Sequence, residues 1–361
     1  MTQFYHTRVY MGILAALLVL SVLIFFHELG HFLAARFFGV QVDVFSIGFG
    51  KKLWSKQIGK TQWSLSAIPL GGYVKMKGQD DSDPTNISYD DDSYNTKKPW
   101  QRIIILLAGP FANFLMAFML YLAIAYLGVP KLLSYVGSVG KETPAFQAGI
   151  QINDKIIQIN GKKTPYWENI GKTINSSEGS VSLLVERNGT LLDLTLWPKV
   201  IEDQNLFGEP IQRRIIGISP LNKQESVHYG LVEGFGYAWE ETKKSSLLIF
   251  ESLQKLITGV VSTDKLGGII TIVDVTAKAS AAGILSLFFF TALISVNLGV
   301  LNLLPIPALD GGHIVFNLYE MLTGKPANEK VMMYLTMIGW GLLLALMLLG
   351  LYNDIHRLIG G

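Results

Sequence analysis

Four long stretches of the sequence contain no aspartate, glutamate, lysine or arginine: Val9–Phe26, Ile103–Pro130, Ala279–Leu309 and Val331–Asn353. A helix rises about 1.5 Å per residue, so each stretch is long enough to cross the roughly 30 Å hydrocarbon core of a bilayer. Only 16% of all residues are charged, whereas soluble domains usually contain about 25%. The sequence therefore predicts a polytopic α-helical membrane protein with four transmembrane helices.

The distribution of basic residues predicts how the chain crosses the membrane. Segment 39–102, between the first two stretches, contains nine lysines and arginines, whereas the residues before the first stretch contain only Arg8. Short loops rich in lysine and arginine stay on the cytoplasmic side. We therefore expect segment 39–102 to be cytoplasmic, the region between the second and third stretches to be exported, and both termini to lie outside.

Segment 41–78 has the pattern of a β-hairpin rather than of an ordinary loop. Residues 61–68 (TQWSLSAI) roughly alternate polar and apolar side chains, and glycines punctuate the segment, as strands and tight turns require. Two interpretations remain open. The hairpin lies on the surface, or it dips into the membrane beside the helices, where protein or a water-filled cavity must satisfy its backbone. The acidic and polar residues 79–98 are expected to form a mobile loop.

The exported region begins with a compact β-rich pattern. The Asn188–Gly189 pair separates two apolar runs, which is a strong signal for a hairpin with a tight turn. Residues 144–148 (PAFQA) fit the start of a short helix. The order of these features resembles a PDZ domain of the bacterial protease type, a fold that binds extended peptide ends by adding a strand to a sheet edge. The alternative is a small β domain with no ligand.

Residues 225–262 have the spacing of an amphipathic helix. Leu231, Phe235, Ala238 and Thr242 recur every three or four positions, as one helix face requires. The apolar stripe lapses at residues 245–246 before it resumes. Two placements fit such a helix: on the outer membrane face, or packed on the preceding β domain.

These patterns divide the chain into seven consecutive segments. They are transmembrane helix 1 (1–38), a cytoplasmic or reentrant β region with an acidic loop (39–99), transmembrane helix 2 (100–130), an exported PDZ-like domain (131–224), an exported amphipathic helical region (225–278), transmembrane helix 3 with a cytoplasmic loop (279–330) and transmembrane helix 4 with a C-terminal tail (331–361). A membrane-associated β-hairpin and an exported β-rich domain thus complete the predicted fold.

The motif His27-Glu28-Leu29-Gly30-His31 directly follows the first charge-free stretch and is itself followed by more apolar residues. Residues four apart share a face of a helix. Both imidazoles can therefore reach one ion, while Glu28 lies beside the open position of that ion as a base for water. Ionisable side chains at membrane depth each cost about 2.5–3.5 kcal/mol on insertion scales. Three so close together favour a shared metal site over a polar cluster that merely joins helices.

A metal site of this kind needs a third protein ligand. The chain has no cysteine and only six histidines, so the ligand is a carboxylate or another imidazole. Asp310 is the main candidate because it follows the third apolar stretch, where Pro305 and Pro307 break the helix and two glycines come next. Irregular backbone at membrane depth is tolerated beside a polar cavity. His313 is the alternative ligand.

Four motifs together resemble the site-2 protease family of intramembrane zinc proteases and, within it, the bacterial regulator-of-sigma-E proteases. They are HELGH directly after the first charge-free stretch, AGPFANF at the start of the second, NLLPIPALDGG at the end of the third and IPLGGYVKM between the first two. With the PDZ-like pattern, the resemblance covers nearly the whole chain. It implies zinc as the cofactor, His27, His31 and Asp310 as its ligands, and Glu28 as the general base.

The resemblance also implies where and on what such an enzyme acts. The expected substrates are transmembrane segments of single-span proteins, such as anti-sigma factors or signal-peptide remnants. The expected location is the lipid bilayer of the bacterial inner membrane, with the active site near the cytoplasmic side. The hairpin is implied to pair with unwound substrate, and Asn302 to contact its backbone. The residues expected to bind substrate are Asn302, Pro305, Pro307, Leu65, Ser66 and Ala67.

Two features depart from the best-known regulator-of-sigma-E proteases. Those proteins carry two tandem PDZ domains, whereas residues 131–225 leave room for one, and the segment Leu266–Ile269 lacks the proline that the family often shows. Other function classes fit less well. The net charge of +2 gives no reason to expect a nucleic-acid partner. A metal transporter would show repeated inward polar residues, and a binding protein without catalysis has no need of Glu28.

Overall fold

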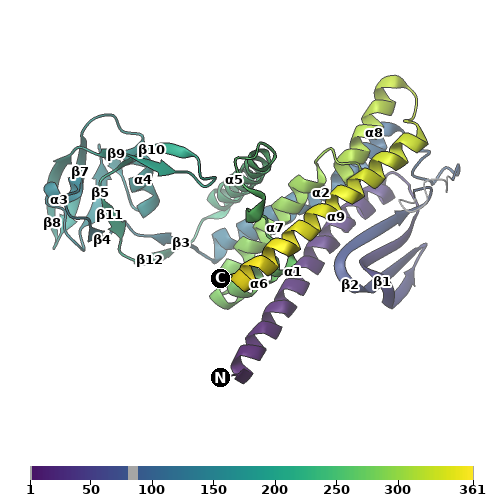
Figure 1. Ribbon diagram of the computed structural model, residues 1–361, viewed down its shortest axis with the longest axis horizontal. Helices are drawn as coiled ribbons and strands as arrows, with labels where there is room; N and C mark the ends of the chain where they lie inside the picture. The colour runs from purple at the N-terminus through teal and green to yellow at the C-terminus, as the bar shows by residue number, and fades with distance from the viewer. Residues whose placement is uncertain (1, 80–87, 361) are drawn as a thin grey trace. The chain divides into compact units, whose positions relative to one another are not determined.

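The computed structural model describes residues 2–79 and 88–360. Within those ranges, four helices are long and apolar enough to cross a membrane (Figure 1). They are α1 (Thr2–Phe37, with its apolar span beginning at Gly12), α2 (Pro99–Leu127), α7 (Ile284–Asn302) and α9 (Glu329–Gly360). Each coincides with one of the charge-free stretches, so the prediction of a polytopic helical protein is confirmed.

The described residues form two compact units. The membrane unit comprises residues 2–124 without 80–87, 235–256 and 262–360, and the β domain comprises residues 125–234 and 257–261. Besides the four long helices, the membrane unit contains β1 (Val42–Ile58), β2 (Thr61–Met76), most of α5 (Leu231–Ile257), the short 3-10 helix η1 (Thr263–Lys265), α6 (Ile269–Ala282) and α8 (Asp310–Thr323). Residues 80–87, in the polar loop expected at 79–98, lie outside the described residues.

The third charge-free stretch is not one continuous helix. α6 ends at Gly283, whose φ of +117° favours glycine, and α7 begins at the next residue. After α7 ends at Asn302, residues 303–309 are irregular until α8 begins at Asp310. Both prolines of the motif lie in this irregular segment, because proline lacks the N–H group that a helix interior needs.

β1 and β2 fold into a single sheet that contacts α1 (Figure 1). Residues 44–47 have partners on both sides, residues 62–65 on one and residues 72–75 on the other. Residues 62–65 are also paired on both sides, because residues 54–57 take their second edge. The sheet therefore has two outer segments, 54–57 and 72–75, whose second edges pair with no strand in the described part of the chain.

α5 packs on α2 within the membrane unit. Its residues Ala238, Thr242 and Ser245 are buried, and the Ser245 hydroxyl lies 2.8 Å from the hydroxyl of Tyr121 in α2. The apolar stripe lapses at residue 245 as the sequence indicates, but the buried face continues there because Ser245 meets a tyrosine hydroxyl. No sequence pattern indicated this contact with α2.

Short strands surround an aliphatic core in the β domain. Four of them form one sheet in the order β6-β5-β7-β8, and three further pairs join β4 to β11, β3 to β12 and β9 to β10. The elements are β3 (Val129–Leu132), β4 (Val136–Val139), α3 (Pro144–Gln147), β5 (Lys155–Ile159), β6 (Lys162–Lys163), α4 (Trp167–Asn175), β7 (Val181–Arg187), β8 (Thr190–Leu196), β9 (Lys199–Gln204), β10 (Pro210–Ile215), β11 (Ile218–Pro220) and β12 (Gln224–Val227). Asn188 and Gly189 join β7 to β8 with φ of 49° and 81°, which confirms the predicted tight hairpin.

One charged group is buried inside the β domain. Asp154 is only 1% exposed. Its Oδ1 accepts a hydrogen bond from Arg187 Nε at 2.7 Å, and its Oδ2 accepts one from Arg187 Nη2 at 2.7 Å and one from the Gln151 backbone at 2.8 Å. Both oxygens have donors, so this carboxylate is fully paired by its own domain.

A second buried carboxylate, Asp354 near the end of α9, caps the start of α6. It accepts hydrogen bonds from the first backbone N–H groups there, beginning with that of Gly268 at 3.0 Å, and these groups have no partner inside the helix. An added Cβ at Gly268 would lie 2.6 Å from the Gly350 backbone, so this contact excludes a proline there. α9 also touches the irregular segment, where the Thr336 hydroxyl donates to the Pro307 carbonyl at 3.3 Å.

Candidate metal centre

His27 and His31 lie one turn apart on α1, near the end of its apolar span. Their Nε2 atoms are 3.2 Å apart, and their rings are nearly perpendicular, at 85°. Both rings therefore turn the same nitrogen toward one point. Glu28 follows His27 directly, so its side chain leaves the helix beside the two imidazoles.

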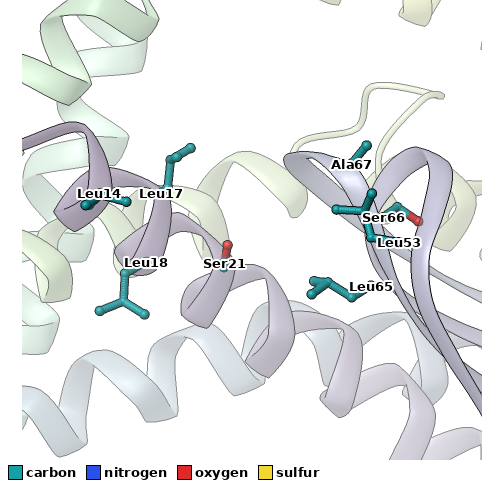
Figure 2. A pocket seen from close by; sticks show the side chains of 8 residues that line it. All are labelled: Leu14, Leu17, Leu18, Ser21, Leu53, Leu65, Ser66 and Ala67. Carbon is teal, nitrogen blue, oxygen red and sulfur yellow. The ribbon is translucent and has the colours of Figure 1, made fainter. Parts of the chain in front are cut away.

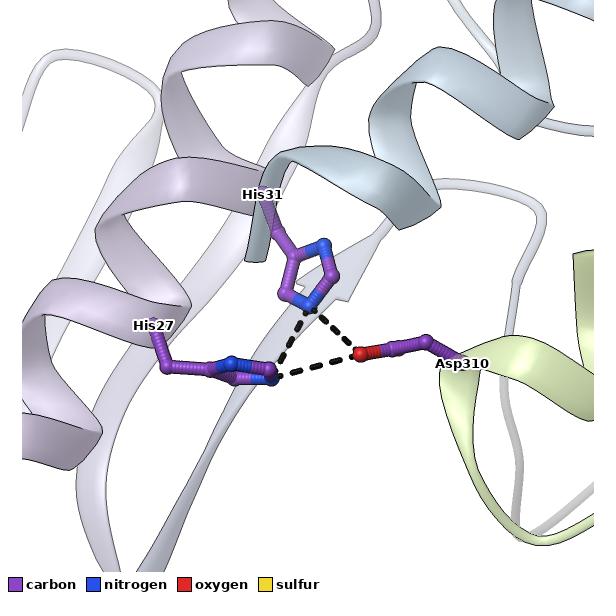
Figure 3. A group of neighbouring side chains, drawn as sticks. All are labelled: His27, His31 and Asp310. Atoms are coloured by element: carbon purple, nitrogen blue, oxygen red, sulfur yellow. Dashed lines mark hydrogen bonds and ion pairs between the residues drawn. The ribbon is translucent and has the colours of Figure 1, made fainter. Parts of the chain in front are cut away.

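Asp310, the first residue of α8, completes the cluster (Figure 3). Its Oδ2 lies 3.4 Å from His27 Nε2 and 3.5 Å from His31 Nε2. That oxygen is buried and accepts no hydrogen bond from the described residues. The structure thus brings together the three predicted ligands, whereas His313, the alternative, is not part of the group.

The three atoms have the separations that a tetrahedral zinc ion requires. Ligands about 2.0–2.1 Å from zinc lie roughly 3.3 Å apart when the angles are tetrahedral, and the observed separations are 3.2, 3.4 and 3.5 Å. Two imidazoles and one carboxylate are a donor set of zinc enzymes, which keep a fourth position open. The unpartnered Oδ2 of Asp310 is also consistent with a metal site, because a bound metal would supply the partner that the protein does not.

α2 orients both imidazoles from behind. His31 Nδ1 lies 2.8 Å from the Ile105 carbonyl oxygen, and His27 Nδ1 lies 3.1 Å from the side-chain amide of Asn113. Hydrogen bonds at Nδ1 fix the tautomer that leaves Nε2 for a metal. The amide nitrogen of Asn113 faces His27 Nδ1 here, and its buried Oδ1 has no partner among the described residues. Rotation of the amide by 180° exchanges the two atoms, so that Oδ1 accepts a hydrogen bond from the Nδ1–H of His27.

Two glycines let α1 and α2 approach closely at this site. A Cβ added to Gly109 would lie 2.2 Å from His31 Nε2, and one added to Gly30 would lie 2.2 Å from the Ala108 carbonyl oxygen. A side chain at either position would displace a ligand or separate the helices. The motifs HELGH and AGPFANF, far apart in the sequence, therefore meet at one contact.

The sequence profile of peptidase family M50 matches residues 15–346. The chain belongs to this family. A protein of Campylobacter jejuni, named as a predicted zinc metalloprotease, is 47% identical over 347 residues, which cover 96% of this chain and 94% of the relative. A Helicobacter pylori protein with the same kind of name is 42% identical over 352 residues, with 96% and 99% covered. A crystal structure of the PDZ domain of an SdrC-like protein from Listeria monocytogenes is 21% identical, covers 24% of this chain and 85% of its own, and has a TM-score of 0.20.

Membership of family M50, the site-2 protease family, establishes the chemistry. The protein is a zinc metalloprotease of the membrane. The donor set at the end of α1 and the start of α8 is the place where described residues could hold that zinc. The prediction of a zinc enzyme of this family is therefore confirmed.

The predicted substrate-binding residues of this M50 peptidase fall into two groups. Asn302 ends α7, and Pro305 and Pro307 lie in the irregular segment that leads to Asp310. The Asn302 amide has no hydrogen-bond partner within the described residues. All three residues therefore lie in the stretch that runs from the last residue of α7 to the aspartate that begins α8.

Leu65, Ser66 and Ala67 form the second group and line an apolar groove between the sheet and α1 (Figure 2). The other lining residues are Leu14, Leu17, Leu18 and Ser21 on α1 and Leu53 on β1. For Leu65, the prediction of main-chain pairing with substrate is wrong, because its backbone is already paired with Ile47 and with Trp54. Alternating polar and apolar residues indicate a strand but not which of its edges are occupied.

An open edge of the β1–β2 sheet lies beside Glu28. Gly72 belongs to the outer segment 72–75, and a Cβ added to it would lie 3.0 Å from Glu28 Cγ and 2.7 Å from Ile24 Cγ2. The outer segment therefore passes directly beside the candidate general base.

Sequence reasoning missed Asn113 and Gly109 as parts of the site. Both lie in the AGPFANF motif, which carries the family resemblance but does not by itself indicate a contact with the histidines. Asn113 is the single amide side chain in the second charge-free stretch. An isolated amide in a helix that crosses lipid was the available signal, because such a group needs a partner there.

Proposed function

We propose that the protein is an intramembrane endopeptidase that cuts peptide bonds within the transmembrane segments of single-span proteins. The position of the cluster carries this proposal. His27, Glu28 and His31 lie in an apolar helix long enough to span the membrane, and Asp310 follows another such helix by a short segment. A peptide bond that reaches these side chains comes from within the bilayer.

His27, His31 and Asp310 are assigned as the zinc ligands and Glu28 as the general base. Zinc, when bound, polarises the scissile carbonyl and activates water near neutral pH. Glu28 takes a proton from the attacking water and delivers it to the leaving amine nitrogen. The Asn302 amide donates a hydrogen bond to the substrate backbone or to the developing oxyanion.

The outer edge at residues 72–75 supplies main-chain partners for the unwound substrate. A transmembrane helix satisfies its own backbone, and each N–H or C=O group freed in lipid costs several kcal/mol. Strand pairing at this edge replaces the lost hydrogen bonds. Its closeness to Glu28 supports this edge over residues 62–65, which are paired on both sides.

The apolar groove lined by Leu65, Ser66 and Ala67 receives the part of the substrate that stays helical. Its opposite wall is the α1 face that continues toward Glu28, since Ser21 and Glu28 are two turns apart. Pro305 and Pro307 contact the unwound part, because their segment leads directly to Asp310.

The proposed setting is the bacterial inner membrane, with both termini outside and the active site near the cytoplasmic side. The support is the basic segment 39–102, which directly follows the helix that carries HELGH. The proposed substrates are anchored regulators such as anti-sigma factors, or signal-peptide remnants. The β domain then lies on the opposite side of the membrane and takes no part in the chemistry.

We assign the β domain to control of access, as a PDZ-like module that excludes substrates with bulky exported domains. Deletion of residues 131–224 then allows cleavage of a substrate whose exported domain is intact. If the domain instead captures freshly trimmed ends, deletion slows cleavage of the trimmed substrate. A zinc-loaded deletion variant that cuts neither substrate rules out both forms of control.

The test of the main proposal uses the full chain in lipid vesicles with a set of single-span proteins. Cleavage products are mapped by mass spectrometry, and zinc is measured on the same sample. We expect cuts inside the apolar segment that a chelator abolishes and added zinc restores. Cuts confined to the soluble parts of the substrates contradict intramembrane proteolysis.

A further inference from the structure

α8 carries the third metal ligand but is itself sparsely supported. Its exposed apolar side chains, each more than one third accessible, are Val315, Leu318, Tyr319, Met321 and Leu322. Its buried residues are Gly311, Gly312 and Asn317. The two glycines meet the backbone of residues 303–307, and Asn317 donates to the His313 carbonyl of its own helix. These contacts fix the N-terminal end of α8 to the chain that precedes it. The C-terminal end of α8 is held by a different interaction.

That interaction is an ion pair between α8 and α2. Arg102 Nη2 lies 2.5 Å from Glu320 Oε1, and the two side chains are only 13% and 22% exposed. Arg102 Nε is buried and has no hydrogen-bond partner among the described residues. Within the described part of the chain, the guanidinium therefore depends on Glu320, and loss of either partner leaves a half-buried charge uncompensated.

Each of these two helices also reaches the metal centre at a second point, α2 through the Ile105 carbonyl and α8 through Asp310. Arg102 is one turn before Ile105, whose carbonyl holds His31. Glu320 is ten residues after Asp310, about 15 Å along a continuous helix. A helix moves as a rigid rod, so an anchor at Glu320 also sets the direction in which Asp310 points.

We propose that Arg102 and Glu320 are positioning residues that hold the Asp310 carboxylate at the two imidazoles. This inference rests on the proposed role of Asp310 as a zinc ligand. It adds that the geometry of the site is set by α2 on both sides: through Ile105 and Asn113 for the histidines, and through Arg102 for the aspartate.

Zinc affinity of the full-length protein tests the proposal, measured by competition with a zinc-binding dye. Arg102→Met and Glu320→Gln are each expected to weaken zinc binding about tenfold or more, as removal of groups that support metal ligands does. The exchanged pair, Arg102→Glu with Glu320→Arg, is expected to restore most of the affinity. The absorption spectrum of the cobalt-substituted protein should change in both single variants and return in the exchanged pair.

Lys278→Met is the matched control, because Lys278 forms an ion pair with Asp274 within α6 at 2.7 Å and should leave zinc affinity unchanged. Asp310→Asn is measured in the same series. Wild-type affinity in Asp310→Asn removes the ligand on which the inference rests. Weak affinity in Asp310→Asn with wild-type affinity and cobalt spectra in folded Arg102→Met and Glu320→Gln overturns the inference alone. If the single variants do not fold, an exchanged pair that folds but binds zinc as weakly as Asp310→Asn overturns it.

Discussion

Asp154 in the β domain is fully buried and the Asp310 side chain in the membrane unit is only 17% exposed, but the two carboxylates differ in what surrounds them. Asp154 receives three hydrogen bonds from Arg187 and the Gln151 backbone, so both of its oxygens have donors. Asp310 faces two imidazoles, and its Oδ2 accepts no hydrogen bond from the described residues. Burial of a charge without full pairing is costly, so an incomplete set of partners indicates a place for a ligand.

Asp354 shows that a carboxylate in the membrane unit can also have its hydrogen bonds completed by the protein. It belongs to the membrane unit, yet backbone N–H groups at the start of α6 and the Thr271 hydroxyl all donate to it. The protein thus completes the hydrogen bonding of Asp354 but leaves Asp310 open. The comparison separates a carboxylate that joins two helices from one that is left open for a ligand.

The largest effect is expected at the open carboxylate. Asp310→Asn replaces an anionic ligand with a neutral amide and should lower zinc affinity by more than about a hundredfold, since even groups behind the ligands contribute ten- to a hundredfold. Cleavage should fall to background. Zinc content by atomic absorption and a cleavage assay on the same sample check this, and full activity would move the third ligand elsewhere.

Glu28→Gln sharpens the comparison, because it should remove the general base and leave zinc binding intact. Glu28 is not part of the group of three ligands, so zinc content should stay at the wild-type level. The cleavage rate should fall about 10²–10⁴-fold, the usual contribution of a general base. A variant that loses its zinc would show that Glu28 holds the metal site together.

Asp154→Asn applies the same carboxylate-to-amide change to the closed site. It leaves Arg187 without its charged partner and should destabilise the β domain by about 3 kcal/mol. Zinc content should not change. Hydrogen exchange of the β5 and β7 amides in the full-length protein measures the loss, and a fall in zinc content instead would end the distinction between the two sites.

Asn113→Ala should give the smallest effect. It removes the amide behind His27 while leaving all three ligands, so zinc affinity should drop about tenfold. Asn113→Asp is the paired variant, because a carboxylate also accepts from Nδ1–H and should retain more of the affinity than alanine. Equal affinity in wild type and Asn113→Ala would mean that α1 alone orients His27.

Features set by neighbouring residues could be predicted from the sequence, and features set by distant partners could not. The spacing of His27 and His31 on a helix, the charge-free spans and the Asn188–Gly189 turn depend on local geometry. The pairing of residues 62–65 on both sides depends on how β1 folds back, which no alternating pattern encodes. The burial of Ser245 could not be predicted because its partner, Tyr121, lies on a helix more than a hundred residues earlier.

The candidate site shows the same division. The motifs named the three side chains that the structure brings together, because the histidines are four residues apart on one helix and Asp310 follows a break marked by two prolines. The roles of Ile105 and Arg102 were out of reach, because a backbone carbonyl leaves no trace in the sequence and a single arginine before an apolar stretch is ordinary in a membrane protein. Only the meeting of α2 with α1 and α8 gives these residues a role.

The three proposed ligands come from opposite ends of the chain, and this has a consequence for how the protease is made. A ribosome produces the two histidines with the first helix and the aspartate only after α7 is complete. Until then, a nascent or prematurely ended chain in the membrane carries two histidines and no third ligand. If these residues are the ligands, a fragment that ends before Asp310 has no finished zinc site and is not expected to cut the membrane proteins inserted beside it.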